Sequence, residues 1–112
     1  MSARTACLAM CCLLATASFA SAQNAALIQR GQKVYAEQKC SVCHSIGTAG
    51  NKKGPLDDVG SKLSEADIRM WITGAPEMAA KVKAERKPVM KSYTLSKDDL
   101  DALVAYLSSL KK

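Results

Sequence analysis

Apolar residues recur at helical spacing in the last part of the chain. From residue 100 onwards they stand three or four positions apart, at Leu100, Leu103, Val104, Leu107 and Leu110. This spacing is typical of a helix with one buried face. Ser96 is placed to cap the N-terminus of that helix, with Asp98 and Asp99 in its first turn. The pattern predicts a helix over residues 97–110.

Two more helices are predicted in the middle of the chain. Ser64 is expected to cap SEADIRMWIT, with Asp67 in its first turn and Gly74 at its end. Pro76 can open a short helix over PEMAAKVKAER, which Pro88 must end. The stretch 47–60, GTAGNKKGPLDDVG, has the composition of a loop. Nowhere does a convincing period-two strand pattern occur.

An earlier helix is predicted over AALIQRGQKVYAEQ, with Asn24 as its N-cap and Leu27, Val34 and Tyr35 on one side. Gly31 lies inside it, at a cost of about 1 kcal/mol relative to alanine. Such a glycine suggests that another backbone or ring approaches closely, although a merely tolerated glycine is the alternative. Taken together, these patterns predict an all-α protein.

The N-terminus has the pattern of an export signal. A short basic region is followed by an almost unbroken apolar run over residues 6–20 and by Ala20-Ser21-Ala22, the small-x-small pattern of a cleavage site. A membrane-spanning helix needs about 20 apolar residues, so this run is short for a span. We predict a cleaved signal peptide over 1–22 and one domain over 23–112, located in the periplasm and without a membrane span. An uncleaved anchor is the alternative. A lipoprotein fits less well, because bulky Met10 precedes Cys11.

Composition and charge limit the kinds of cofactor and partner that the protein can have. Three of the five cysteines lie in the predicted signal, which leaves Cys40 and Cys43. A domain this small with few aromatic residues buries little surface and would gain from a large apolar cofactor. The formal net charge is +6, but the lysines are spread out and no basic run occurs. Nucleic acid is therefore excluded as a partner, and an acidic protein surface is favoured.

Cys40, Cys43 and His44 form the sequence CSVCH, which allows three interpretations. A structural zinc site needs four ligands, and no other Cys or His follows the predicted signal. A thioredoxin-like dithiol follows a strand, whereas a helix is predicted here. Covalent haem uses all three residues: two thiols form thioethers with the vinyl groups, and the adjacent histidine becomes an axial iron ligand. The haem interpretation is the one that fits.

The second axial ligand must come from elsewhere in the chain. His44 is the only histidine, so two histidines from this chain cannot ligate the iron. Methionine is the usual partner of histidine in electron-transfer haems and raises the reduction potential. Met70 and Met78 lie within predicted helices, where packing is the simpler role. Met90 lies in an extended stretch before the last helix and is the predicted ligand.

The order of these segments resembles the class I cytochrome c family in its short bacterial periplasmic form. The matching parts, over essentially the whole chain after the signal, are GQKVY, CSVCH, GPLDDVG, SEADIRMWIT, KPVMKSYTLS and KDDLDALVAYLSSL. The resemblance implies a fold in which the N- and C-terminal helices cross over a covalently bound haem c. It implies that Cys40 and Cys43 hold the haem, and that His44 and Met90 ligate its iron.

The resemblance implies further roles. The backbone carbonyl of Pro55 would accept the other ring N–H of the axial histidine, which fixes its tautomer. Gly31 and Tyr35 would cross the C-terminal helix near Tyr106. Trp71 would line the haem pocket or reach a propionate, with a core role as the alternative. Met90 is followed by lysine, whereas many members of the family have proline there.

The predicted function is periplasmic one-electron transfer by a protein that is not an enzyme. Its partners would be an oxidase, reductase or dehydrogenase with an acidic docking surface, met by Lys52, Lys53, Lys87 and Lys91. One alternative is a dedicated haem subunit of a periplasmic dehydrogenase that oxidises sulfite or an organic substrate. Another is a haem enzyme or gas sensor with an open iron site, which requires that Met90 does not bind.

Overall fold

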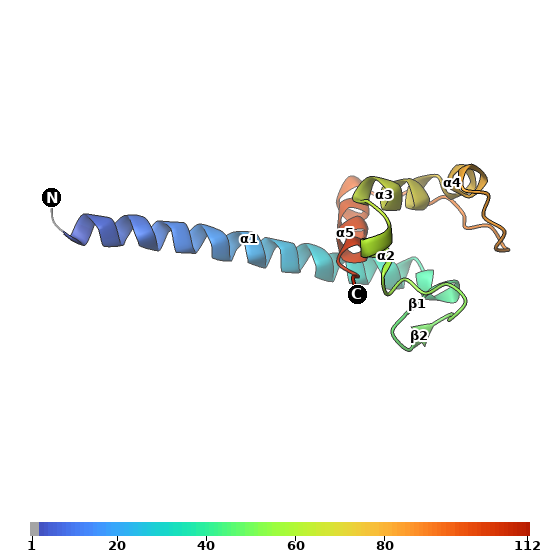
Figure 1. The fold of residues 1–112 in the computed structure, drawn as a ribbon, viewed down its shortest axis with the longest axis horizontal. Coiled ribbons are helices and arrows are strands. Elements are labelled where there is room, and N and C mark those ends of the chain that lie inside the picture. Colours follow the sequence, from blue (N-terminus) through green and yellow to red (C-terminus); the bar gives the residue numbers. More distant parts are fainter. Residues whose placement is uncertain (1–2) are drawn as a thin grey trace.

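Helices make up most of the protein, as the sequence predicts (Figure 1). The computed structural model describes residues 3–112, with side chains from residue 19 onwards. The helices are α1 (Ala3–Glu37), α2 (Val59–Lys62), α3 (Glu65–Thr73), α4 (Ala75–Lys81) and α5 (Lys97–Ser108). A 3-10 turn, η1 (Cys40–Val42), and two short strands, β1 (Ser45–Ile46) and β2 (Ala49–Gly50), lie between α1 and α2.

Helix α1 is longer than predicted. It begins at Ala3, so Asn24 lies within the helix and does not cap it. The apolar, alanine-rich stretch upstream is itself helical, and the backbone ladder therefore passes through Asn24 without a break. The first part of α1 projects away from the rest of the molecule (Figure 1). The predicted signal, 1–22, falls mostly on residues outside those with described side chains, and its cleavage stays a prediction. Over residues 19–112, no helix is long and apolar enough to cross a membrane.

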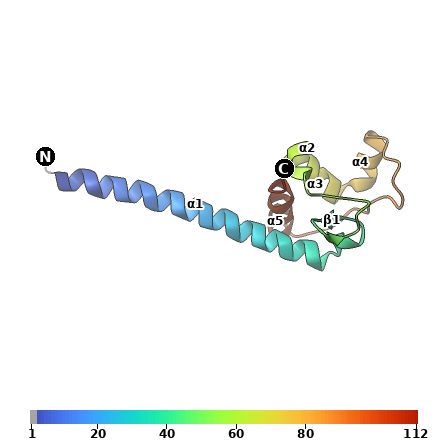
Figure 2. The ribbon, with the colours of Figure 1, turned by 60° about the horizontal axis from the view of Figure 1, so that its bottom comes forward.

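The second half of α1 crosses α5, and this crossing is the centre of the fold (Figures 1 and 2). Gly31 is buried there, and a Cβ added to it would overlap the carbonyl of Ala102. The predicted close approach at Gly31 is confirmed. One turn further along, the rings of Tyr35 and Tyr106 meet edge to face, with centroids 5.9 Å apart. Both tyrosines therefore lie at the crossing, as the resemblance implied.

The core is built on this crossing by α1, α3 and α5. Its buried members are Val34, Ile68, Ile72, Leu103, Val104 and Leu107, with Leu100 and Leu110 partly buried against them. The predicted apolar stripe of the last helix thus faces the core. The predicted caps are also confirmed, because Ser64 and Ser96 accept hydrogen bonds from the backbone N–H groups of Asp67 and Asp99.

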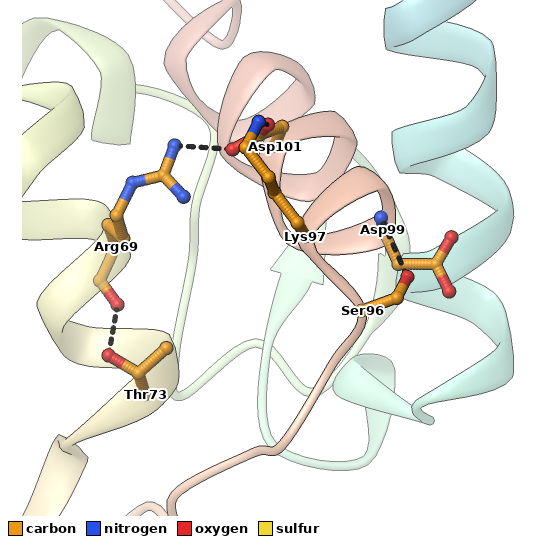
Figure 3. A network of polar contacts seen from close by, with 6 residues as sticks. All are labelled: Arg69, Thr73, Ser96, Lys97, Asp99 and Asp101. Atoms are coloured by element: carbon orange, nitrogen blue, oxygen red, sulfur yellow. Dashed lines mark hydrogen bonds and ion pairs between the residues drawn. The ribbon is translucent and has the colours of Figure 1, made fainter.

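A polar network joins α3 to α5 at the edge of the core (Figure 3). Asp101 on α5 pairs with Arg69 on α3 at 2.9 Å and with Lys97 on its own helix at 2.8 Å. These hydrogen bonds lower the pKa of the Asp101 carboxyl, the one from Lys97 most. The network aligns the two helices. It adds little to stability, because all three side chains are substantially exposed.

Helix α4 ends at Lys81, well before Pro88, so this helix is shorter than predicted. Lys83 has a left-handed backbone with φ of 54°, which an α-helix cannot accommodate. Residues 82–96 then run without regular secondary structure to α5. The backbone N–H of Tyr93 donates to the carbonyl of Ile72 at 2.8 Å, which attaches the end of this segment to α3.

The stretch predicted to be entirely loop contains short regular elements. Strands β1 and β2 pair antiparallel, with Ser45 opposite Gly50 and Ile46 opposite Ala49. Helix α2 is a single turn whose end packs near the end of α5, where the N–H of Gly60 donates to the carbonyl of Leu110 at 2.8 Å. Elements of two and four residues are too short to produce a periodic pattern in the sequence.

Candidate haem site

The CSVCH residues form one tight turn directly after α1. Lys39 ends the helix in a left-handed conformation with φ of 56°, and the turn η1 follows. The carbonyl oxygen of Cys40 accepts hydrogen bonds from the N–H groups of Cys43, at 3.2 Å, and His44, at 2.9 Å. The two thiols and the imidazole are therefore carried by a single turn of backbone. Both thiols are free; Cys40 is partly buried and Cys43 is exposed.

The imidazole of His44 is oriented by one hydrogen bond. Its Nδ1 lies 3.0 Å from the carbonyl oxygen of Gly54. A carbonyl can only accept, so Nδ1 carries the proton and Nε2 keeps a free lone pair. Burial lowers the pKa of His44, although the bond to Gly54 opposes this effect and the charge of Arg86 adds to it. A neutral imidazole with Nε2 available is the form that ligates a metal.

The acceptor of this bond differs from the expectation. The resemblance implied the carbonyl of Pro55, whereas the structure shows the carbonyl of Gly54, the residue before it. The backbone explains the difference. Ser45, which is buried, donates its N–H to Gly54 at 3.0 Å and accepts from Leu56 at 2.8 Å. These bonds on both sides of Pro55 turn the Gly54 carbonyl towards the CSVCH turn.

Asn51 supports the same turn and was not singled out from the sequence. Its N–H is shared between the carbonyl oxygens of Ser41, at 3.1 Å, and His44, at 3.0 Å. Its side-chain amide donates to the carbonyl of Val42 at 3.1 Å. One asparagine thus satisfies three carbonyls within CSVCH. The available signal in the sequence was an asparagine after a glycine in a loop, a common turn pattern that does not reveal its partners.

Arg86 is the second contributor that the sequence did not indicate. Its Nη2 donates to the carbonyl oxygen of Cys43 at 2.6 Å, across 43 positions of sequence. The contact depends on how residues 82–96 fold back over the turn, and no local pattern encodes it.

The three methionines after the predicted signal lie in different surroundings. Met78 is buried in the core, at 5% exposure, as its predicted packing role requires. Met70 is 46% exposed on α3, so it lies at the surface of the helix. Met90 is partly buried in the segment between α4 and α5 and borders an open cavity of about 480 Å³. Of the three, Met90 alone lies outside regular secondary structure.

Two tyrosines, Tyr35 and Tyr93, lie near the cysteines. Burial raises the pKa of Tyr93, and the nearby Cys40 and Cys43 thiols raise it further. Burial likewise raises the pKa of Tyr35 to about 12, with a smaller effect from Cys40. Trp71 is partly buried on α3, next to Ile72, whose carbonyl holds Tyr93. The hydroxyl of Tyr35 is buried and has no hydrogen-bond partner within the protein.

The donor set fits a covalently bound haem. Two unpaired thiols on one turn can reach two vinyl groups, and the adjacent imidazole presents a free Nε2 with its other nitrogen held by a carbonyl. The helical fold and this turn together define the class: an all-α protein with a covalent haem site.

Comparison with known proteins identifies the family. Residues 28–111 match the family model described as cytochrome c. The chain therefore belongs to the cytochrome c family, and its cofactor is a covalently bound c-type haem with iron, for which Cys40 and Cys43 have the required spacing. Its fold is the cytochrome c fold, and the chemistry of that family is haem-based electron transfer.

One curated relative is similar at 30% identity over 95 residues, the "Cytochrome c oxidase subunit 2" of Alkalihalophilus pseudofirmus (strain ATCC BAA-2126 / JCM 17055 / OF4). The match covers 76% of this chain and 26% of that protein, so the chain spans about a quarter of its relative's length. No solved structure matches the chain.

Proposed function

We propose that this protein is an exported one-electron carrier whose haem is attached through Cys40 and Cys43 and ligated by His44 and Met90. The observation that carries the proposal is the geometry of His44. Its Nδ1 is engaged by Gly54 at 3.0 Å, which leaves Nε2 free beside two unpaired thiols. When bound, the haem iron supplies reversible one-electron oxidation and reduction.

The chain's own residues prepare the site for that role. The bond from His44 to Gly54 fixes the ring's tautomer and makes Nε2 a better donor. The thioether sulfur of Met90, as the second ligand of the iron, would favour the ferrous state and raise the reduction potential. Met90 suits this role because its segment contains no helix, so its sulfur can reach the iron without breaking one. Trp71 and Pro55 are proposed to line the haem, with Pro55 holding the Gly54 carbonyl in place.

Export to the periplasm is proposed from the N-terminal sequence. The basic start, the apolar run and Ala20-Ser21-Ala22 together have the pattern of a cleaved signal peptide over residues 1–22. N-terminal sequencing of the mature protein tests this directly. A first residue of Gln23 is expected, and a mature chain that still begins near Met1 would contradict cleavage.

Docking on acidic redox partners is proposed for four lysines. Lys52, Lys53, Lys87 and Lys91 are exposed. The first two follow the hairpin beside the CSVCH turn, and the other two lie in the segment of Met90. Charges in these positions would steer an acidic surface towards the site, as complementary charges do in transient complexes. The protein is proposed to carry electrons without catalysing a reaction of its own.

A second candidate is a permanent electron-transfer subunit of an oxidoreductase complex, such as a dehydrogenase. The observation that favours it is the relative named above, which is an oxidase subunit. Affinity purification from the native host separates the two candidates. A free carrier elutes as a single small protein, whereas a subunit brings a larger partner in fixed stoichiometry.

The ligation is tested with two methionine variants of the purified holoprotein. Methionine sulfur on ferric iron gives a weak long-wavelength charge-transfer band. Met90→Ala is expected to remove this band and to lower the reduction potential. Met70→Ala, the matched control on exposed α3, should keep both unchanged. If Met90→Ala retains the band, Met90 is not the ligand.

A further inference from the structure

Arg86 reaches from the segment between α4 and α5 to two places, the CSVCH turn and Gly54. Its Nη2 donates to the carbonyl oxygen of Cys43 at 2.6 Å. Its Nη1 lies against Gly54, so close that a Cβ added there would overlap it. The guanidinium therefore fills the space that a side chain at position 54 would take. Glycine at this position is required by the arginine and by the carbonyl of Cys43.

Both contacts are adjacent to the support of His44. Cys43 directly precedes His44 in the chain, and Gly54 accepts the bond from its Nδ1. The arginine thus lies against the residue before His44 and against the residue whose carbonyl holds the imidazole.

Arg86 also belongs to the segment of Met90, four positions before it. Beyond the turn that ends α4, residues 85–96 have no helix or strand of their own. On the far side of Met90, the N–H of Tyr93 is held by the carbonyl of Ile72 at 2.8 Å. On the near side, the side chain of Arg86 donates to the carbonyl oxygen of Cys43. Met90 therefore lies between these two points of attachment.

We propose that Arg86 is a positioning residue that fastens the Met90 segment to the CSVCH turn and so couples the positions of His44 and Met90. The proposal rests on the proposed ligation by His44 and Met90. Arginine suits this role because its planar fork presents several N–H donors to neighbouring backbone groups, whereas lysine is a point charge on a flexible stem. Its fixed positive charge also disfavours the ferric state, which carries one more positive charge than the ferrous state, and so raises the reduction potential.

The proposal is tested with Arg86→Gln and Arg86→Lys in the holoprotein. Lys81→Gln at the end of α4 is the matched control, because it removes the same charge from an exposed residue. Three quantities are measured: the temperature at which the methionine charge-transfer band is lost, the reduction potential, and hydrogen exchange of the Tyr93 amide, whose N–H is bonded to the carbonyl of Ile72.

Both arginine variants are expected to lose the band at a lower temperature than the wild type. Their Tyr93 amide should exchange at least about fivefold faster, because a charged hydrogen bond that held the segment is gone. The potential should fall further in Arg86→Gln than in Arg86→Lys, which keeps the charge. Lys81→Gln should match the wild type in band and exchange.

Two results would separate the possible failures. If the wild type shows the band and the arginine variants behave like Lys81→Gln, the role of Arg86 is wrong while ligation by Met90 stands. If the wild type lacks the band, the ligation itself is wrong, and the proposal for Arg86 fails with it. Arg86→Lys keeps the charge of the native residue, so the test remains decisive even if Arg86→Gln does not fold.

Discussion

A Cβ added to Gly31 would come within 2.5 Å of the Cβ of Tyr106. Real Cβ atoms do not approach so closely, so any larger residue at position 31 must push α1 and α5 apart. The crossing of these helices carries much of the core, including Val34 and Val104. The distance between the backbones of α1 and α5 is therefore set by the lack of a side chain at Gly31.

Gly31→Ala is expected to destabilise the protein. Overpacking costs about 1–3 kcal/mol, and the gain in helix propensity of about 1 kcal/mol offsets only part of this cost. We expect a net loss of up to about 2 kcal/mol in the free energy of unfolding, measured by urea denaturation of the holoprotein. Gln32→Ala on the exposed side of the same helix is the control and should be neutral or slightly stabilising. Equal stability of both variants would show that the helices can separate at little cost.

Replacing Lys39 by glycine is expected to stabilise the protein, whereas the same replacement of a lysine inside a helix should destabilise it. The φ of 56° at Lys39 places this residue in the left-handed region, which costs a non-glycine residue about 1–2 kcal/mol. Lys39→Gly should therefore raise stability by up to about 1 kcal/mol, after the greater entropy of an unfolded glycine is subtracted. Lys33→Gly, at an exposed position within α1, should lower stability by about 1 kcal/mol. A shift of the same sign in both thermal unfolding curves would refute the left-handed turn before Cys40.

Tyr35 is expected to make the protein sensitive to alkali. The phenol has an ordinary pKa of 10.0, which burial raises to about 12 in the folded state. Between these values the unfolded chain has released the proton and the folded chain still holds it. Stability is therefore fully present below pH 10.0 and falls as the pH rises towards 12. Tyr35→Phe should flatten this decline, measured as the denaturation midpoint against pH.

The same substitution has a second expected effect at neutral pH. The Tyr35 hydroxyl is buried without a hydrogen-bond partner in the protein, which costs about 1–3 kcal/mol in typical sites. Tyr35→Phe removes this atom and keeps the ring against Tyr106, so stability should rise by about 1 kcal/mol. A loss of stability would mean that the hydroxyl has a partner in the holoprotein.

The proposed lysine surface predicts a salt-dependent electron-transfer rate. The screening length falls from about 10 Å at 0.1 M salt to about 3 Å at 1 M. The rate with an acidic partner should therefore fall steeply over this range. Lys87→Gln should lower the rate several-fold at low salt and leave it unchanged at high salt. Lys111→Gln, beyond the end of α5, is the control. A flat salt response of the wild type would exclude electrostatic docking.

The parts of the fold that followed from the sequence are those determined locally. Ser64 and Ser96 cap their helices because a side-chain oxygen meets an N–H three positions later, and the apolar stripe from Leu100 to Leu110 needs only helical periodicity. The close approach at Gly31 was also predictable, since a costly residue inside a helix calls for a compensating contact. The CSVCH turn was also predictable, because Cys40, Cys43 and His44 lie close together in the sequence.

Features that depend on distant backbone could not be predicted in the same way. The choice of the Gly54 carbonyl as acceptor, in place of Pro55, follows from how Ser45 and Leu56 pair around it. The bond from Arg86 to Cys43 spans 43 positions. Asn24 matched the pattern of an N-cap, yet helix α1 passes through it. A good capping residue does not mark the start of a helix where the residues upstream also favour helix. The proposed ligation of iron by Met90 likewise depends on the cofactor, which sequence periodicity does not reveal.

The crossing of α1 with α5 also fixes the order in which the molecule can be assembled. Its partners lie far apart in the sequence, with Val34 on α1 and Val104 on α5. This packing cannot form while α5 is still being synthesised, because contacts between distant segments must wait for the second segment. The CSVCH turn precedes α5 in the chain, so its cysteines are synthesised before the core can form. Closure of the core over α1 must therefore wait for the last helix.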